Sequence, residues 1–468
     1  MKKSLLVLGG AALLGFTAIT PPASAQTLPS NDGRSSSPSL DNPGITATIT
    51  DPIYRTPYPR NTPPGRLVAV EKADWKLIYP FVAEYPSFVW WQDTYKIAFT
   101  TEDSLGKPVI GTALLTQPYR AKGAKYLAAG NKIWVNAQYI NGLSLRCTPS
   151  QTYKLWMGDG ATSPQVIEGL LAAEGASNLA PKARSLSVLT PDLLGVNMAY
   201  GVNIASGRLI LDAMRALQHA PSMGYDDPDF VVQGFSGGAM ASAAAATLMP
   251  TYAPSLLKRT KAIFMGGTPM DMISISAKYR KNKNEAFVQK GNEQIGMGLA
   301  VAIGLSRQYP ALHDYLYRHL TPHGREVVHD FNSMCLSEMV DYVKANQLAM
   351  NEIVDRNLLD DAVLDSYLRK ESVKYISGMP TVFPGQHLYL YHGNGDVDVP
   401  VKDVWDQYYK WLHHGVNVSM TMVPSRDHIS AQPVSIGPLI SEAVLELYRP
   451  RTDTSRPLVN TVINNAVI

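Results

Sequence analysis

PDFVVQGFSGGAMASAAAATLMP, residues 228–250, is the stretch that decides the fold. It begins with a short apolar run typical of a buried strand and ends with the small residues of a closely packed helix. Ser236 lies between them, with Gly234 and Gly238 two positions to either side. Gly-x-Ser-x-Gly between a strand and a helix predicts a tight, strained turn that exposes the serine hydroxyl. We therefore expect Ser236 to be a nucleophile; a glycine-rich turn without chemistry is the alternative.

Strand-like and helix-like segments alternate on both sides of this turn. Strands are expected at residues 95–118 (a hairpin), 132–140, 184–192, 228–235, 260–269, 387–393 and 418–424. Helices are expected at residues 163–176, 201–220, 237–250, 401–415 and 437–448. Such alternation indicates an α/β fold, a mostly parallel sheet with helices on both faces. Residues 270–385 are mostly helical, too long a segment for one crossover, and predict an inserted helical subdomain.

The N-terminus has the pattern of an export signal. Lys2 and Lys3 precede an apolar run over residues 5–19, and small residues follow up to Ala25. This order predicts a secretory signal peptide that is cleaved after Ala25. A membrane anchor is the alternative, but the run is short for a bilayer span of about 20 residues. We expect the mature protein to be secreted or periplasmic.

The rest of the chain divides by composition. A stretch rich in Ser, Pro, Asn and Gly cannot bury a core and predicts a flexible arm. The six expected segments are a signal peptide 1–25, the arm 26–64, a first core part 65–269, the helical insertion 270–385, a second core part 386–449 and a polar tail 450–468.

Net charge bears on the kind of partner that the chain binds, and cysteine content bears on whether it has a disulfide. The formal net charge is +3, from 42 Lys and Arg against 39 Asp and Glu. This small excess argues against a nucleic-acid partner, which usually meets a clustered basic face. Cys147 and Cys335 are the two cysteines. In an oxidising compartment they form either one bridge or two buried thiols.

A serine nucleophile needs a base, and the base needs an orienting acid. YHGNGDVDVPV, residues 391–401, follows a strand and holds two carboxylates, Asp396 and Asp398. Asp396 comes first after the glycine turn, so we expect it to be the acid. His392 in the same stretch is expected to be a packed loop residue.

Three histidines follow Asp396, namely His413, His414 and His428. The first two end a helix before Gly415, where the helix dipole explains them. His428 follows the strand at 418–424 in a loop that can reach back over the carboxyl edge of the sheet. We therefore expect His428 to be the base.

The motifs GFSGGAM, GGTPMDM, YHGNGDVDVPV and SRDHIS occur in this order. Together with TPDLLGVNMAYGVNIASGRLILDAMRAL they resemble the secretory lipase family, which includes the Candida-type secretory lipases and A-type lipase. The likeness covers about residues 90–448. It implies an α/β-hydrolase fold with Ser236 as nucleophile, Asp396 as acid, His428 as base and the Gly237 amide as an oxyanion donor.

The resemblance also implies roles outside the triad. The second oxyanion donor of the family is an aspartate; the matching position is Asn141, so its amide or that of Gly142 is expected to donate. Cys147 and Cys335 match a disulfide pair of the family. Asp192 matches a loop aspartate that is expected to be a structural hydrogen-bond acceptor.

The implied function is that of a secreted serine hydrolase that cleaves carboxylic esters, most of all triacylglycerols, without a metal or an organic cofactor. By resemblance, the insertion at 270–385 forms a lid and an acyl tunnel. IGMGLAVAIGL, residues 295–305, is expected to line that tunnel, to contact lipid aggregates or to be ordinary core. The other hypotheses are an esterase for short or aromatic acyl groups, an acyltransferase, a polyester hydrolase, a serine peptidase and a non-catalytic binding protein. The sequence predicts no oligomeric state.

Overall fold

The computed structural model describes residues 51–73, 92–118, 131–152, 186–280, 287–381, 386–448 and 462–463. The predicted signal peptide lies outside these residues. So do the helix predicted at 163–176 and most of the predicted tail.

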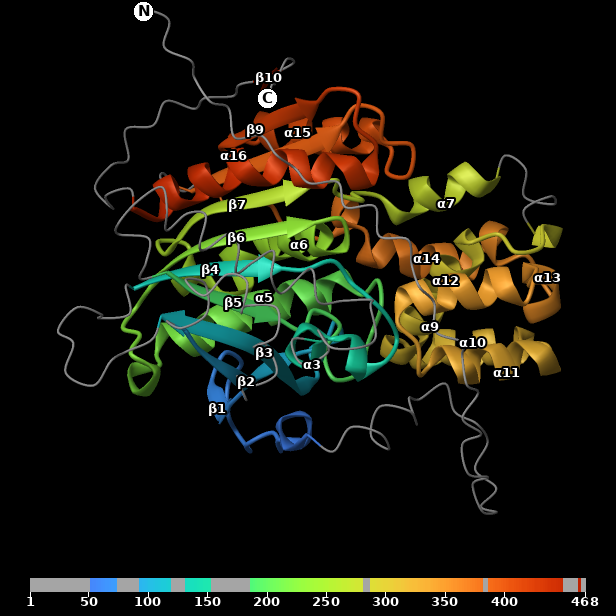
Figure 1. Cartoon of the computed structure of the whole chain (residues 1–468), viewed down its shortest axis with the longest axis horizontal. Coiled ribbons are helices and arrows are strands. Elements are labelled where there is room, and N and C mark those ends of the chain that lie inside the picture. The colour runs from blue at the N-terminus through green and yellow to red at the C-terminus, as the bar shows by residue number, and fades with distance from the viewer. Residues whose placement is uncertain are drawn as a thin grey trace, which may run out of the picture. The chain divides into compact units, whose positions relative to one another are not determined.

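The described strands form one sheet in the order β1-β2-β3-β5-β4-β6-β7-β8-β9-β10 (Figure 1). Their bounds are β1 Leu67–Lys72, β2 Gln92–Glu102, β3 Pro108–Pro118, β4 Lys132–Ala137, β5 Ser187–Pro191, β6 Asp229–Phe235, β7 Thr260–Gly266, β8 His387–Gly393, β9 Val418–Val423 and β10 Val462–Ile463.

The sheet is mixed, with a parallel major part. β1, β2 and β3 pair antiparallel, and β3 pairs antiparallel with β5. All pairs from β5 through β4 and β6 to β10 are parallel. The predicted hairpin is confirmed, since β2 and β3 pair from Gln92–Pro118 to Glu102–Pro108. The strands predicted at 132–140 and 260–269 end earlier, at Ala137 and Gly266, because the chain there turns into loops of the candidate site.

Helices lie on both faces of the sheet and in the insertion. The α-helices are α3 Pro149–Thr152, α5 Asn203–Gln218, α6 Gly237–Tyr252, α7 Met272–Arg280, α9 Gln294–Gln308, α10 Pro310–His319, α11 Pro322–Phe331, α12 Leu336–Ala345, α13 Met350–Ile353, α14 Ala362–Glu371, α15 Val401–His413 and α16 His428–Tyr448. Short 3₁₀ helices are Pro52–Arg55, Leu145–Cys147, Pro221–Met223, Pro254–Leu256, Leu358–Asp360 and Val373–Tyr375.

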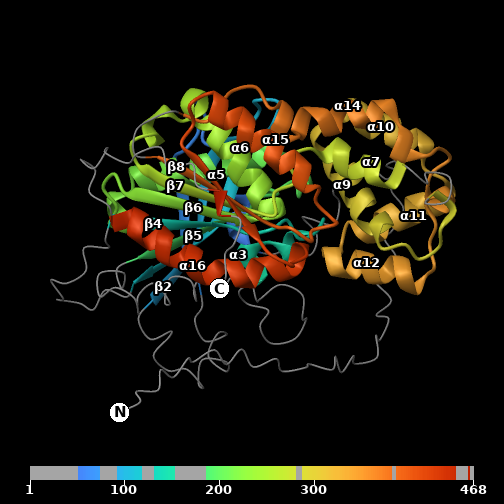
Figure 2. The ribbon, with the colours of Figure 1, turned by 90° about the horizontal axis from the view of Figure 1, so that it is seen from above.

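Two hydrophobic clusters hold the helices on the sheet. α5, α6 and α15 share the larger cluster with one face, and α16 packs its Ala443 and Leu447 on the other face (Figure 2). The small residues of α6 allow α5 and α6 to approach closely, since a Cβ at Gly207 of α5 would lie 2.8 Å from the Ala245 amide nitrogen. The expected α/β architecture is therefore confirmed, with the strand-turn-helix unit at its centre.

The insertion between β7 and β8 contains α7 and α9–α14. Figures 1 and 2 show these helices gathered beyond the arrowheads of the parallel strands. Most apolar side chains of the segment 295–305, such as Leu299 and Ile303, are buried in the same cluster as the sheet core, whereas Met297 is 42% exposed. Most of this segment is therefore ordinary core.

Buried polar contacts join the insertion to the sheet domain. The Glu371 carboxylate at the end of α14 is fully buried and accepts from the Ile204 amide at the start of α5 and from the Tyr309 hydroxyl. Burial raises the pKa of Glu371, and these two hydrogen bonds oppose the rise. These hydrogen bonds therefore hold the insertion against α5, the helix that precedes Ser236 in the chain.

Residues 51–64, the described end of the arm predicted to be flexible, make specific contacts with the rest of the chain. Asp51 accepts from the Ile53 amide and pairs with Lys96, whose side chain is buried on β2. Ile53 is 3% exposed, and the Tyr54 hydroxyl bonds to Ser150. Composition gave no sign of this because the partners lie about 45 and 95 residues away.

No helix in the part of the chain that the structure describes is both long and apolar enough to cross a bilayer.

Candidate active site

The turn at Ser236 joins β6 directly to α6. Ser236 has φ 51° and ψ −118°, a conformation that residues with a side chain rarely adopt. Its amide donates to the Gly266 carbonyl at 2.8 Å, which fixes the turn on the end of β7. The strained turn that the sequence predicts is therefore present.

The two flanking glycines are required by close backbone approach. A Cβ at Gly238 would lie 1.9 Å from the carbonyl oxygen of Ala137 at the end of β4. A Cβ at Gly234 would lie 2.4 Å from the carbonyl oxygen of Gly238. A methyl group at either position would collide with backbone, so the strand-turn-helix geometry depends on both glycines.

The structure brings together the three residues predicted as a triad. His428 Nε2 lies 2.9 Å from Ser236 Oγ, and His428 Nδ1 lies 2.7 Å from Asp396 Oδ2. Asp396 and His428 are 9% and 8% exposed, respectively. This chain of hydrogen bonds has the connectivity that lets an imidazole remove a serine proton while a carboxylate stabilises the resulting charge.

The histidine ring is held by its surroundings. His428 is the first residue of α16, not part of a free loop as expected from the sequence. The Phe235 ring lies 5.2 Å from the His428 ring, and a Cβ at Gly267 would lie 3.0 Å from His428 Cε1. The loop after β7 therefore packs directly on the candidate base.

Asp396 is held as an anion. Its Oδ1 accepts from the Asp398 and Val399 amides, each at 2.9 Å. Burial raises the pKa of Asp396, but the hydrogen bonds from His428 and Val399 outweigh burial and leave the pKa below its ordinary value. Asp398, the competing carboxylate, is exposed, and its contact with Asp396 is through its backbone amide.

Gly237, the predicted oxyanion donor, is the first residue of α6. Amides at a helix N-terminus carry partial positive charge and suit a developing oxyanion. A Cβ at Gly237 would lie 2.5 Å from Ile140 Cγ1 and 3.0 Å from the Ile140 amide nitrogen. The loop after β4 therefore lies against Gly237. Ile140 makes that contact, and no sequence motif marked this residue.

Comparison with known proteins identifies the family to which the chain belongs. The family model described as secretory lipase matches residues 172–441, more than half of the chain. The chain belongs to the secretory lipase family. It is 24% identical to Lipase 2 of Candida albicans over 337 residues, which cover 69% of this chain and 66% of that relative, just under two thirds of its length. It is 26% identical to a secreted triacylglycerol lipase of Malassezia furfur, covering 60% of this chain and 69% of that one.

Solved structures of similar fold include Candida antarctica lipase A in its closed state. That structure has a TM-score of 0.66 and 21% identity, and the alignment covers 86% of this chain and 87% of that one. The likeness supports the α/β-hydrolase fold expected from the sequence.

In this member of the secretory lipase family, Asn141 and Gly142 pair with the insertion. The Leu336 amide donates to the Asn141 carbonyl at 2.9 Å, and the Leu143 amide donates to the Met334 carbonyl at 3.1 Å. These two bonds flank an antiparallel bridge between Gly142 and Cys335. The sequence predicted that Asn141 and Gly142 lie near the oxyanion, and the disulfide implied by resemblance links Cys147 to Cys335. No local pattern, however, predicted that Gly142 itself pairs with Cys335.

A disulfide joins the same two segments. Cys147 and Cys335 are bonded, with their Cα atoms 5.6 Å apart. Arg307 of α9 adds a further link, since it donates to the Leu143 carbonyl at 2.9 Å and to Asn332 at 2.6 Å. Burial lowers the pKa of Arg307 to about 9.

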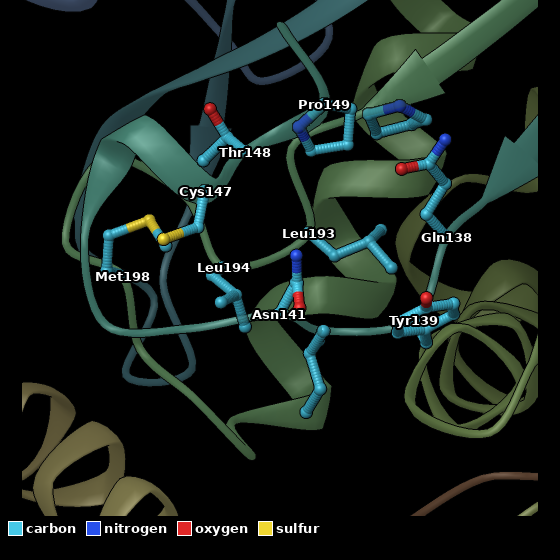
Figure 3. A pocket seen from close by; sticks show the side chains of 11 residues that line it. Gln138, Tyr139, Asn141, Cys147, Thr148, Pro149, Leu193, Leu194 and Met198 are labelled. Carbon is cyan, nitrogen blue, oxygen red and sulfur yellow. The ribbon is translucent and has the colours of Figure 1, made fainter. Parts of the chain in front are cut away.

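A small pocket lies behind this loop. It is lined by residues of the loop and of the segment after β5, among them Asn141, Leu193 and Leu194 (Figure 3). Its volume of about 20 Å³ is comparable to the space of one water molecule and far below that of an acyl chain. In the part of the chain that the structure describes, the Asn141 Nδ2 atom is buried without a hydrogen-bond partner.

Asp192 has the structural contacts expected of it. It accepts from the Thr112 hydroxyl at 2.6 Å, from the Ser150 amide at 3.1 Å and from the Ser150 hydroxyl. Burial raises its pKa to about 6, although these hydrogen bonds lower it. Asp192 thus holds the segment that follows Cys147 on the sheet.

The remaining histidines of the sequence analysis lie apart from this chain of bonds, with one exception. His414 Nδ1 bonds to the Lys410 carbonyl at the end of α15, and His413 is the last residue of that helix. His392, expected to be a packed loop residue, is buried as expected but belongs to strand β8, and its Nε2 atom lies 3.2 Å from Asp396 Oδ2. Among the residues described, no group of three or more His, Cys, Asp or Glu side chains is arranged to hold a metal ion.

Proposed function

We propose that this chain is an exported serine hydrolase of carboxylic esters, with triacylglycerols as its main substrate class. The observation that carries the proposal is the hydrogen-bonded series Asp396–His428–Ser236 at a strained turn. Its occurrence in a member of the secretory lipase family supports the reaction class.

The mechanism follows from these distances. Ser236 Oγ attacks the ester carbonyl carbon while His428 Nε2, 2.9 Å away, takes the hydroxyl proton. The imidazolium then gives this proton to the leaving alcohol. Asp396 fixes the Nδ1–H tautomer and stabilises the cation. Water, deprotonated by the same imidazole, hydrolyses the acyl-enzyme and regenerates Ser236.

The oxyanion of each tetrahedral intermediate is bound by the Gly237 amide and by a second amide, from Asn141 or Gly142. Gly237 lies at the N-terminus of α6, where the helix dipole adds to the hydrogen bond. One such donor typically contributes 10²- to 10³-fold to kcat.

Substrate class and location rest on the relatives and on the N-terminal sequence. One relative is named a secreted triacylglycerol lipase. The charged, apolar and small-residue order of residues 1–25 supports export. We assign residues 270–385 as the lid of this lipase, with lipid or another ester as its partner.

Rates on esters of increasing acyl length, offered below and above their solubility, test the proposal. We expect hydrolysis of long-chain triacylglycerol emulsions and its loss in Ser236→Ala, with thermal unfolding unchanged. Activity on short or aromatic esters only would favour the esterase hypothesis. Transfer to an added alcohol in preference to water would favour an acyltransferase, and release of monomers from a solid polyester would favour a polyester hydrolase. If no ester is cleaved and a fluorophosphonate labels no serine, the result would favour a non-catalytic binding protein.

A further inference from the structure

His392 lies near the carboxyl end of β8, just before the turn that holds the candidate acid Asp396. It is completely buried. Its Nε2 atom is 3.2 Å from the Val399 carbonyl oxygen and 3.2 Å from Asp396 Oδ2. The Oδ2 atom is the one that receives the His428 Nδ1–H. His392 therefore approaches the carboxylate oxygen on which the proposed triad depends.

The contacts of His392 define its tautomer. A carbonyl oxygen can only accept, so Nε2 carries the hydrogen in the bond to Val399. In the part of the chain that the structure describes, Nδ1 is buried without a partner. Burial lowers the pKa of His392, although Asp396 and the Val399 carbonyl raise it. His392 is thus a neutral imidazole whose N–H group faces the acid turn.

The same turn residue joins His392 to the acid. The Val399 amide donates to Asp396 Oδ1 at 2.9 Å, while the Val399 carbonyl accepts from His392. By holding Val399, His392 holds the amide that donates to Asp396 Oδ1. The N–H group of His392 also lies against the other carboxylate oxygen, Asp396 Oδ2. Both effects hold the carboxylate in the rotation that points Oδ2 at His428.

On the basis of the proposed function, we propose that His392 is a positioning residue that holds Asp396 in the orientation needed to align His428. It touches neither substrate nor nucleophile and acts through the acid alone. Partners that orient a metal-ligating side chain typically contribute about 10- to 100-fold to activity, and we expect a similar contribution from a group that orients a catalytic carboxylate.

A matched control lies on the same strand. His387 begins β8, is 5% exposed and has its Nε2 3.1 Å from the Ser419 hydroxyl. It is at the opposite end of β8 from the acid turn. His387→Leu and His392→Leu therefore each remove a buried imidazole from β8, but only the second removes one that contacts the proposed acid.

The experiment measures kcat and KM on a soluble ester for the full chain and three variants, normalised to folded protein by thermal unfolding. We expect His392→Leu to lower kcat about 10- to 100-fold with KM changed less than about 2-fold. His392→Gln, whose Nε2 amide can donate from nearly the same place, should recover kcat to within about 3-fold of the parent. His387→Leu should stay within about 2-fold.

Three results would overturn the inference: full kcat in His392→Leu, an equal loss in His392→Gln, or an equal loss in His387→Leu. If His392→Leu does not fold, the pair His392→Gln and His387→Leu still decides between positioning and packing, because a packing role predicts a loss in both. Failure of the proposed function is seen separately, as a parent protein that cleaves no ester or a Ser236→Ala variant that keeps its rate.

Discussion

Replacing Asp396 by Asn tests the role of the carboxylate, because backbone amides determine the orientation of the new side-chain amide. Oδ1 of Asp396 accepts from two amides, those of Asp398 and Val399, each at 2.9 Å. An Asn side chain must place its carbonyl oxygen there, since its NH₂ group would face two donors. Its Nδ2 group then takes the position of Oδ2, facing His428 Nδ1.

This orientation reverses the tautomer of the base. His428 must accept at Nδ1, so its proton moves to Nε2, the atom 2.9 Å from Ser236 Oγ. An Nε2–H imidazole cannot take the serine proton. We expect kcat to fall about 10⁴-fold, which corresponds to about 5 kcal/mol of lost transition-state stabilisation.

The assay is initial-rate hydrolysis of a chromogenic ester, with thermal unfolding to establish folding and Asp398→Asn as the matched control. Asp398 is exposed, and its hydrogen bond to Asp396 comes from its backbone amide, which Asn keeps. Its variant should therefore stay within about 2-fold of the parent. The reasoning is refuted if folded Asp396→Asn keeps more than about a tenth of the parent kcat, or if Asp398→Asn suffers the larger loss.

Three further predictions concern stability. Gly238→Ala places a Cβ 1.9 Å from the Ala137 carbonyl oxygen, so calorimetry should show a lower melting temperature together with lost hydrolysis; an unchanged melting temperature would contradict the close approach. Replacing Cys147 and Cys335 by Ser removes a disulfide between residues that are 188 positions apart in the sequence. Urea unfolding should show a lower free energy of unfolding, by about 5 kcal/mol at most from chain entropy, and no loss of stability would contradict a bridge that forms in solution. Asp192 has its pKa raised to about 6, so the folded state binds the proton more tightly than the unfolded state from about pH 4 to pH 6. The unfolding free energy should fall through that window as pH rises, by about 3 kcal/mol at most, and Asp192→Asn should reduce the slope; an unchanged slope would assign the pH dependence to other groups.

The sequence allowed prediction wherever the chemistry is local. The turn at Ser236 is specified by glycines within two residues, and steric clashes at Gly234 and Gly238 explain why. The proposed acid and the proposed base were predicted from chain order, since few candidate residues remain after each strand. The alternation of strands and helices was enough to predict a mostly parallel sheet.

Pairings between distant segments were not predictable from local pattern. Asp51 pairs with buried Lys96, and nothing in the sequence around either residue specifies this partner. Gly142 bridges to Cys335, and only the Cys147–Cys335 disulfide implied by resemblance indicated that these two segments meet. His-Gly after a strand can be an oxyanion motif, but His392 was expected to be a packed loop residue because of its position next to the acid turn. Its contact with Asp396 depends on the fold of the turn, which only the three-dimensional arrangement supplies.

The central claim is that Ser236 is the nucleophile, and covalent labelling tests it most directly. The full chain is treated with a fluorophosphonate, and peptide mass mapping locates the adduct. We expect one adduct, on Ser236, that appears in step with the loss of ester hydrolysis and is absent from Ser236→Ala. Stoichiometric labelling of a different serine, or ester hydrolysis that persists while Ser236 is fully modified, would contradict it.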